Sequence, residues 1–215
     1  DPLFQPYTLK HLKLKNRVFS AAHEPFLTED SMPKEKYRLY HEEKAKGGIG
    51  MSMIGGSAVI SQDSPGPFGN INLSNDNVIP WLQKLADSQH RYDCAVVTQI
   101  SHMGRRSSWA KGDWLPLIWS SCQREPAHRR FPKIAEEEDI FRVINDFGQA
   151  ARRVKEGKLD GVEFLCSSQL AGSFVSRSQN FREDDWGGSL EKRMHFNFEV
   201  IKEIRKQAGA DFILG

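Results

Sequence analysis

Cysteine is scarce in this chain of 215 residues. The three cysteines, Cys94, Cys122 and Cys166, form no C-x-x-C pair. Zinc ribbons and iron–sulfur clusters need such paired thiolates, so the sequence supports neither kind of centre, and we expect no metal site. A sparse, odd number of cysteines also suits a reducing compartment. We therefore expect a cytoplasmic protein.

Long hydrophobic runs and a strong net charge are also missing. No stretch of 18 apolar residues occurs, and 30 Lys and Arg nearly balance 28 Asp and Glu, for a net charge of +2. We therefore expect neither a membrane nor a nucleic acid as partner. The hydrophobic fraction of 39% allows a sizeable core. The length fits one large domain, or part of a larger one.

Short apolar runs alternate with amphipathic segments along the chain. A β-rich opening at 7–15 has the pattern of a short hairpin. Strands are expected after it at 18–22, 49–54, 94–100, 161–165 and 212–214. Amphipathic helices are expected between them, beginning near Ser31, Val78, Glu136 and Ser189. Four β-α units followed by a strand predict a parallel sheet with crossover helices.

Two helix and strand boundaries are marked by turn residues. Ser31 is expected to cap the first helix, with Pro33 in its first turn and Gly47–Gly48 as its stop. Gly55–Gly56 is expected to close the second strand. A loop from 107 to 132, rich in Trp, Pro and Ser, is long enough to be either functional or disordered.

The turn after the first strand separates two fold classes. A doubly wound sheet of the Rossmann type should carry G-x-G-x-x-G there, but residues 21–25 read AAHEP. We therefore predict an α/β fold of the (β/α)8 TIM-barrel type. It is incomplete here, with about five of eight strands and an N-terminal hairpin, and residues 1–215 form part of a single domain.

Polar side chains follow the third predicted strand. The stretch 97–106 reads VTQISHMGRR and brings Gln99, His102 and Arg105 to the end of an apolar run. Side chains at the carboxyl ends of parallel strands face the place where ligands bind. The position of these groups therefore predicts a site, with a solvated loop as the alternative.

Four sequence blocks resemble motifs of the old yellow enzyme family, the FMN-dependent (β/α)8 oxidoreductases. They are LKNRV at 14–18, QISHMGR at 99–105, DGVE at 160–163 and NFREDDWGGSLEKR at 180–193. Their order and spacing cover essentially the whole chain, as the N-terminal portion of such an enzyme. The resemblance implies non-covalent FMN, a small-molecule substrate, NAD(P)H as co-substrate, and hydride transfer between them.

The resemblance also implies which residues line the flavin. They are Ala21, Ala22, His23, Gly55, Gly56 and Gln99. Backbone amides and small side chains let the ring lie flat at the strand ends, and the Gln99 amide suits the donor and acceptor edge of its pyrimidine ring. Tight strand packing is an equal interpretation of the two glycines. His102 is a candidate catalytic donor near ring or substrate, with a structural role as the alternative.

The segment after the fourth strand departs from the family pattern. Many members carry H-x-x-[HN] and then a tyrosine, which polarise a carbonyl oxygen and donate a proton. Here Leu165 stands at the first histidine, Ser168 or Gln169 at the second, and Leu170 at the tyrosine. Ordinary enone reduction is therefore disfavoured. Gln169 is kept as a catalytic candidate.

The His23–Glu24 pair is similar to a region of flavin-dependent amine dehydrogenases and N-demethylases. Trimethylamine dehydrogenase has a flavin-linked cysteine at the position of Glu24, so a glutamate implies non-covalent FMN. As a catalytic candidate, Glu24 would hold a cationic amine, with a tryptophan of the long loop adding a cation–π face. The candidates for that face are Trp109, Trp114 and Trp119. The alternative is an exposed Glu24 and tryptophans that pack the loop.

The family resemblance leaves two classes of function open. The first is an FMN-dependent oxidoreductase, either an enoate or dienoyl-CoA type reductase or an amine N-demethylase. The second is a non-catalytic half-barrel that acts as a scaffold or assembly partner, because the chain ends at Gly215 before the phosphate-binding loops expected after strands seven and eight. Open sheet edges lead us to expect a homo-oligomer or a completing chain.

Overall fold

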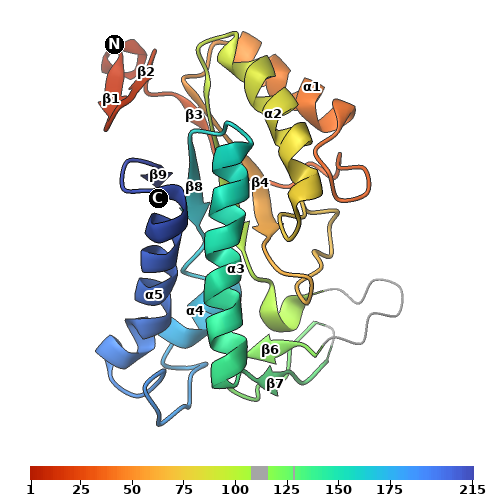
Figure 1. Ribbon diagram of the computed structural model, residues 1–215, viewed down its shortest axis with the longest axis vertical. Helices are drawn as coiled ribbons and strands as arrows, with labels where there is room; N and C mark the ends of the chain where they lie inside the picture. The colour runs from red at the N-terminus through yellow and green to blue at the C-terminus, as the bar shows by residue number, and fades with distance from the viewer. Residues whose placement is uncertain (108–115, 128) are drawn as a thin grey trace.

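The computed structural model describes residues 1–107, 116–127 and 129–215. A hairpin of β1 (Tyr7–Leu9) and β2 (Leu12–Leu14) precedes strands that alternate with helices (Figure 1). These strands are β3 (Phe19–Ser20), β4 (Met51–Val59), β5 (Ala95–Ser101), β8 (Gly161–Phe164) and β9 (Ile213–Leu214). The helices are α1 (Glu35–Lys46), α2 (Ile79–His90), α3 (Glu137–Glu156), α4 (Gln169–Val175) and α5 (Leu190–Ala208).

The main sheet has the strand order β3-β4-β5-β8-β9, and every neighbouring pair is parallel. Each strand therefore pairs with the strands before and after it in the chain. A doubly wound sheet would reverse its strand order at a switch point. The sequential order is that of a (β/α)8 barrel, of which this part of the chain forms five strands.

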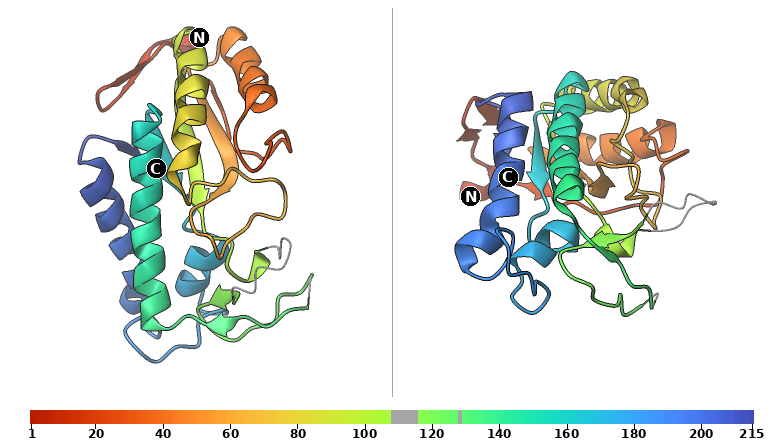
Figure 2. Two further views of the ribbon diagram at one scale, coloured as in Figure 1. Left: turned by 45° about the vertical axis from the view of Figure 1, so that its right-hand side comes forward. Right: turned by 60° about the horizontal axis from the view of Figure 1, so that its bottom comes forward.

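The core lies between the sheet and the helices that cover its outer face. Val96 and Ile100 of β5 join a buried cluster with Phe147 of α3 and Ile204 of α5. Figure 2 shows α3 and α5 side by side along the sheet. Gln99 is on the opposite face of β5, because side chains alternate along a strand. Gln99 therefore points away from the core cluster, toward the inside of the barrel.

Short helical elements follow the carboxyl ends of two strands. The 3₁₀ turn η3 (Gly104–Arg106) follows β5, and α4 follows β8. A small parallel pair, β6 (Ile118–Trp119) and β7 (Lys133–Ile134), lies next to η3 at the lower end of Figure 1. Part of the long loop is therefore regular, which the sequence did not predict.

Three expectations about the elements were wrong. Ser31 does not cap a helix, because α1 begins only at Glu35. Residues 29–32 instead form a tight turn, in which Asp30 and Ser31 have φ of +53° and +58°. Strand β4 does not close at the glycine pair but continues to Val59. Helix α4 was missed, because its seven residues are too few to show a helical period.

Within the residues that the structure describes, no helix combines the length and apolar character that crossing a membrane requires. In the same part of the chain, no group of three or more His, Cys, Asp or Glu side chains is placed to hold a metal ion.

Candidate active site

A bulge interrupts β4 at its glycine pair. The register with β5 shifts between Ile54 and Ala58. Gly55 and Ser57 turn through left-handed conformations, with φ of +64° and +62°. A bulge of this kind takes backbone groups out of the ladder and redirects them. Because it lies near the carboxyl end of the strand, the redirected groups face the mouth of the barrel.

Three consecutive N–H groups of the bulge donate to groups outside the strand ladder. They belong to Gly55, Gly56 and Ser57, and their acceptors are Tyr37 Oη at 2.9 Å, the His23 carbonyl at 3.1 Å and Gln99 Oε1 at 2.9 Å. Asn70 Nδ2 in turn donates to two bulge carbonyls, at 2.8 and 3.2 Å. The bulge thus links α1, the end of β3 and the polar face of β5.

The two glycines face protein atoms. A Cβ on Gly56 would lie 2.6 Å from the carbonyl carbon of His23, and a Cβ on Gly55 would lie 2.8 Å from Thr98 Oγ1. Neither position has room for a side chain, so the glycines allow β3, β4 and β5 to approach closely. The structure therefore favours the packing interpretation of Gly55 and Gly56.

Gln99 connects three strands at the mouth. Besides accepting from Ser57, its amide donates through Nε2 to Glu163 Oε1 at 2.6 Å, and Gln99 and Glu163 are register partners of β5 and β8. A side-chain amide has two donor hydrogens and two acceptor lone pairs. Gln99 therefore keeps one donor and one acceptor for a ligand. The role of Glu163 was missed, although it belongs to the quoted DGVE block.

Ala21, Ala22 and His23 follow β3 directly and lie beside the bulge. Ala21 is exposed and Ala22 is half-buried. The His23 ring turns toward α1, where Nε2 lies 2.8 Å from the Tyr40 hydroxyl, while Nδ1 lies 3.4 Å from the Ala21 carbonyl. The backbone of His23 therefore belongs to the mouth, and its imidazole is held by α1.

Glu24 is a half-buried carboxylate at the same place. Its backbone nitrogen would lie 2.7 Å from a Cβ on Gly56. Glu24 Oε1 accepts from the Phe26 N–H at 3.1 Å, whereas Oε2 is buried and has no partner among the described residues. Burial raises the pKa of Glu24 from 4.5 to about 7, and the bond from Phe26 opposes that rise. A perturbed carboxylate of this kind is typical of functional sites.

His102 belongs to a buried network behind the loop after β5. Its Nε2 lies 3.1 Å from Asp63 Oδ1, and its Nδ1 accepts from the Gly104 N–H at 3.0 Å. Asp63 also accepts from Arg142 at 2.6 Å. Burial alone would raise the pKa of Asp63, but the bonds and charges of His102 and Arg142 outweigh it and hold that pKa well below its usual range. Since both ring nitrogens have partners, the geometry favours a positioning role for His102.

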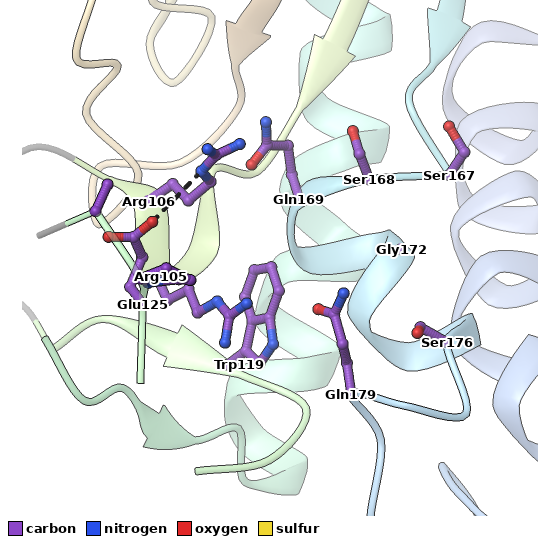
Figure 3. A pocket seen from close by; sticks show the side chains of 12 residues that line it. Arg105, Arg106, Trp119, Glu125, Ser167, Ser168, Gln169, Gly172, Ser176 and Gln179 are labelled. Atoms are coloured by element: carbon purple, nitrogen blue, oxygen red, sulfur yellow. Dashed lines mark ion pairs between the residues drawn. The ribbon is translucent and has the colours of Figure 1, made fainter. Parts of the chain in front are cut away.

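A pocket of about 370 Å³ lies where the segments after β5 and β8 meet (Figure 3). Gln169, at the start of α4, lines it with φ of +55°, and its Oε1 is buried without a partner among the described residues. The structure thus places Gln169 at this pocket. The lining of the pocket includes neither Glu24 nor Gln99, so the structure does not bring Gln169 together with those two residues.

Trp119 does not offer a free aromatic face. The side chain is 3% exposed, and the guanidinium of Arg105 lies 4.5 Å from its ring centre. Because Arg105 already occupies a cation–π position on this ring, the structure favours the alternative in which Trp119 packs the loop. Arg105 also donates to the carbonyls of Gln123 and Arg124, which organises the loop. Trp109 and Trp114 lie outside the described residues.

The sequence profile of the NADH:flavin oxidoreductase / NADH oxidase family matches residues 2–215. The chain belongs to this family. It is 48% identical to a probable N-methylproline demethylase of Rhizobium meliloti (strain 1021), covering all of this chain and 32% of that protein. It is 49% identical to the multifunctional alkene reductase/demethylase OYE of Caballeronia cordobensis, again over all of this chain and 32% of the relative. The chain thus spans about a third of each relative.

The fold of this flavin oxidoreductase chain is also that of solved structures. A structure of morphinone reductase in complex with tetrahydroNAD superposes with a TM-score of 0.91 at 24% identity, and it covers 100% of this chain and 63% of that one. The predicted old yellow enzyme resemblance and the incomplete (β/α)8 fold are confirmed.

Proposed function

We propose that this chain of the flavin oxidoreductase family holds FMN non-covalently at the mouth formed by β3, β4, β5 and β8, and serves the oxidation of N-methylated amines. The observation that carries the proposal is Glu24, with one unpartnered buried oxygen and a pKa near 7 beside the bulge. The two relatives named as demethylases support the same chemistry.

The residues at the mouth fit a flavin. Gln99 keeps one donor and one acceptor for the edge of a ring that offers both. A glutamate at position 24 forms no thioether, so attachment at this residue is non-covalent. When bound, FMN accepts or donates a hydride at its N5 atom. NAD(P)H is the co-substrate that we propose for the reductive direction.

The proposed task of Glu24 is to bind the amine and hold its proton. With a pKa of about 7, the carboxylate is roughly half ionised at neutral pH. An ionised Glu24 attracts a protonated amine, and Oε2 then takes the proton from the amine nitrogen. The neutral amine regains its lone pair, which an N-methyl group needs in order to lose a hydride. Burial strengthens both effects by excluding water.

Alkene reduction is a second candidate, because one relative is named both an alkene reductase and a demethylase. In that reaction two strong donors polarise the substrate oxygen. After β8 this chain offers the hydroxyls of Ser167 and Ser168 and the amide of Gln169, with no imidazole between Phe164 and Leu170. Weaker donors predict slow enone reduction.

Anaerobic flavin spectroscopy separates these candidates. The FMN-loaded full chain is mixed with N-methylproline and, after reduction with NADH, with 2-cyclohexenone. We expect N-methylproline to bleach the flavin and cyclohexenone to reoxidise it slowly. Glu24→Gln should slow bleaching, and Glu29→Gln, an exposed change in the same segment, should not. Fast enone turnover without amine oxidation contradicts the proposal, and a chain that takes up no flavin favours the scaffold alternative.

A further inference from the structure

Two phenylalanines lie exposed on the loops that flank the mouth. Phe26 and Phe68 are 66% and 52% exposed, and their rings meet edge to face with centroids 5.5 Å apart. One belongs to the connection after β3 and the other to the connection after β4. Exposed apolar side chains are usually scattered singly, so a pair that converges from two separate loops points to a surface that binds a ligand.

Both phenylalanines are bonded to groups of the mouth. The Phe26 N–H donates to Glu24 Oε1 at 3.1 Å. The Phe68 N–H donates to Asn70 Oδ1 at 3.3 Å, and Asn70 Nδ2 donates in turn to the Gly56 carbonyl at 2.8 Å. One ring is therefore tied to the half-buried carboxylate and the other to the bulge of β4. An amine held at Glu24 would bring its substituent to this pair.

The two loops hold the rings in place before any ligand binds. Each phenylalanine directly follows a proline, Pro25 or Pro67, whose ring fixes φ. Phe26 has φ of +59°, which a bulky residue rarely adopts. The Thr28 hydroxyl donates to the Gly69 carbonyl and so links one loop to the other. A preorganised surface loses little entropy when a ligand packs on it.

We propose that Phe26 and Phe68 form a subsite for a flat apolar group, of about the size of a phenyl ring, on the amine that is oxidised at the mouth. The inference rests on the proposed function, because it takes the amine nitrogen to lie at Glu24. The ionised carboxylate binds the cationic nitrogen, and the substituent packs against the two rings. N-methylated amines with an aromatic substituent are therefore preferred to those with a small aliphatic one.

The surroundings of the pair favour an apolar group over a charged one. The stretches 25–28 and 64–72 contain no charged residue. Among the described residues, no lysine or arginine lies over either ring. A phosphate or a second carboxylate would find no partner there, whereas an aromatic group would remove apolar surface from water and meet the rings edge to face.

Two matched amines test the subsite by titration calorimetry on the full chain. N,N-Dimethyl-2-phenylethylamine and N,N-dimethylpropylamine have the same dimethylammonium group. They differ only in having a phenyl or a methyl group at the far end. We expect the phenyl compound to bind about tenfold more tightly, because its ring buries apolar surface against two aromatic side chains.

Three phenylalanine variants locate the subsite. Phe68→Ala should remove most of the preference for the phenyl compound and leave the affinity for dimethylpropylamine unchanged. Phe68→Tyr keeps a ring at this position and should keep the preference. Phe198→Ala is the matched control, because Phe198 of α5 is also 52% exposed, and it should change neither affinity. Circular dichroism verifies that the variants fold.

Equal affinity for the two amines overturns the subsite, and so does a preference that persists in Phe68→Ala or disappears in Phe198→Ala. Bleaching of bound FMN by the same amines reports on oxidation separately. If both amines bleach the flavin but bind equally, the proposed function stands without the subsite. If neither bleaches it while the preference depends on Phe68, the oxidation is contradicted and the subsite stands.

Discussion

The half-buried Glu24 should make the protein less stable at alkaline pH than a variant without the charge. Glu24→Gln keeps the shape of the side chain and removes its titration. The folded state holds the proton up to a pKa of about 7, whereas the unfolded chain releases it near 4.5. The folded state therefore binds more protons between these values, and its stability falls as pH rises through this window.

The size of the effect follows from the pKa and the burial of Glu24. A rise of the pKa from 4.5 to about 7 corresponds to roughly 3 kcal/mol for a fully shielded group. Glu24 is only half-buried, so solvent screening reduces this figure. We expect Glu24→Gln to raise the free energy of unfolding by about 1–2 kcal/mol at pH 8 and to leave it unchanged at pH 4.

Urea unfolding at pH 4 and pH 8 measures this difference. Glu29→Gln, exposed in the same segment, is the matched control and should have no effect at either pH. A Glu24→Gln variant with the same stability change at both pH values refutes the reasoning, because the raised pKa is then absent. A variant that is destabilised at pH 8 refutes it as well.

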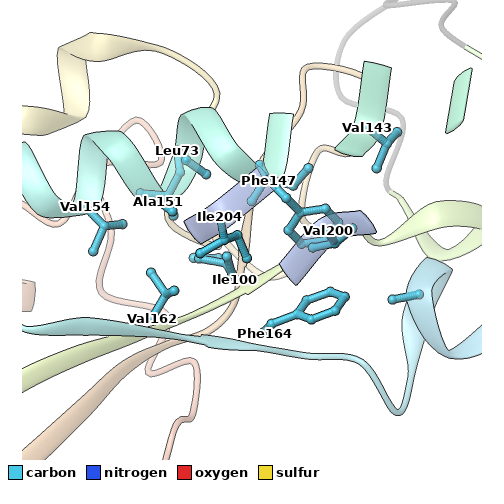
Figure 4. Packing of buried hydrophobic residues seen from close by; sticks show 14 of the residues in the cluster. Leu73, Ile100, Val143, Phe147, Ala151, Val154, Val162, Phe164, Val200 and Ile204 are labelled. Carbon is cyan, nitrogen blue, oxygen red and sulfur yellow. The ribbon is translucent and has the colours of Figure 1, made fainter. Parts of the chain in front are cut away.

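Three further predictions concern the framework of the site. Asp63→Asn should lower the free energy of unfolding by about 2 kcal/mol at pH 7, because His102 and Arg142 lose a charged partner. The pKa of Asp63 is lower in the folded state than in the unfolded chain, so the charge stabilises the fold above the unfolded-state pKa and this gain is lost as pH falls toward the folded-state pKa. In urea unfolding the loss caused by Asp63→Asn should therefore shrink as pH falls below about 4. Gly56→Ala should cost about 1–3 kcal/mol by the same assay, because its Cβ meets backbone 2.6 Å away. Phe147→Ala, which empties the space beside Phe164 in Figure 4, should lower stability by about 3–5 kcal/mol in thermal unfolding.

Much of the fold could be predicted from the sequence, because local periodicity decided it. Helix α2 begins one residue after the expected start at Val78, and both ends of β5 lie within one residue of the expected 94–100, since each segment has a clear apolar pattern. Within the block at 180–193, Arg182 and Asp184 form an ion pair of 2.6 Å, although they are only two residues apart. Contacts as local as these can be inferred from spacing alone.

The rest depends on contacts between residues far apart in the chain. His102 meets Asp63 across 39 positions, and nothing in its own segment shows that both ring nitrogens are taken. The turn at Asp30 and Ser31 uses two positive φ angles without glycine, and nothing in the sequence around Ser31 and Pro33 indicates it. Trp119 pairs with Arg105 through a similar long-range contact. For this reason, the roles predicted for His102 and Trp119 differ from those that the structure favours.

Retention of FMN by Gln99 variants tests the central claim most directly. FMN is titrated into the full chain, into Gln99→Ala and into Gln62→Ala, an exposed control. If the Gln99 amide binds the flavin ring, Gln99→Ala removes two hydrogen bonds to it and should weaken FMN binding at least about tenfold. Gln62→Ala should leave FMN binding unchanged. Equal FMN affinity in all three proteins contradicts a flavin site at the mouth of β3, β4, β5 and β8.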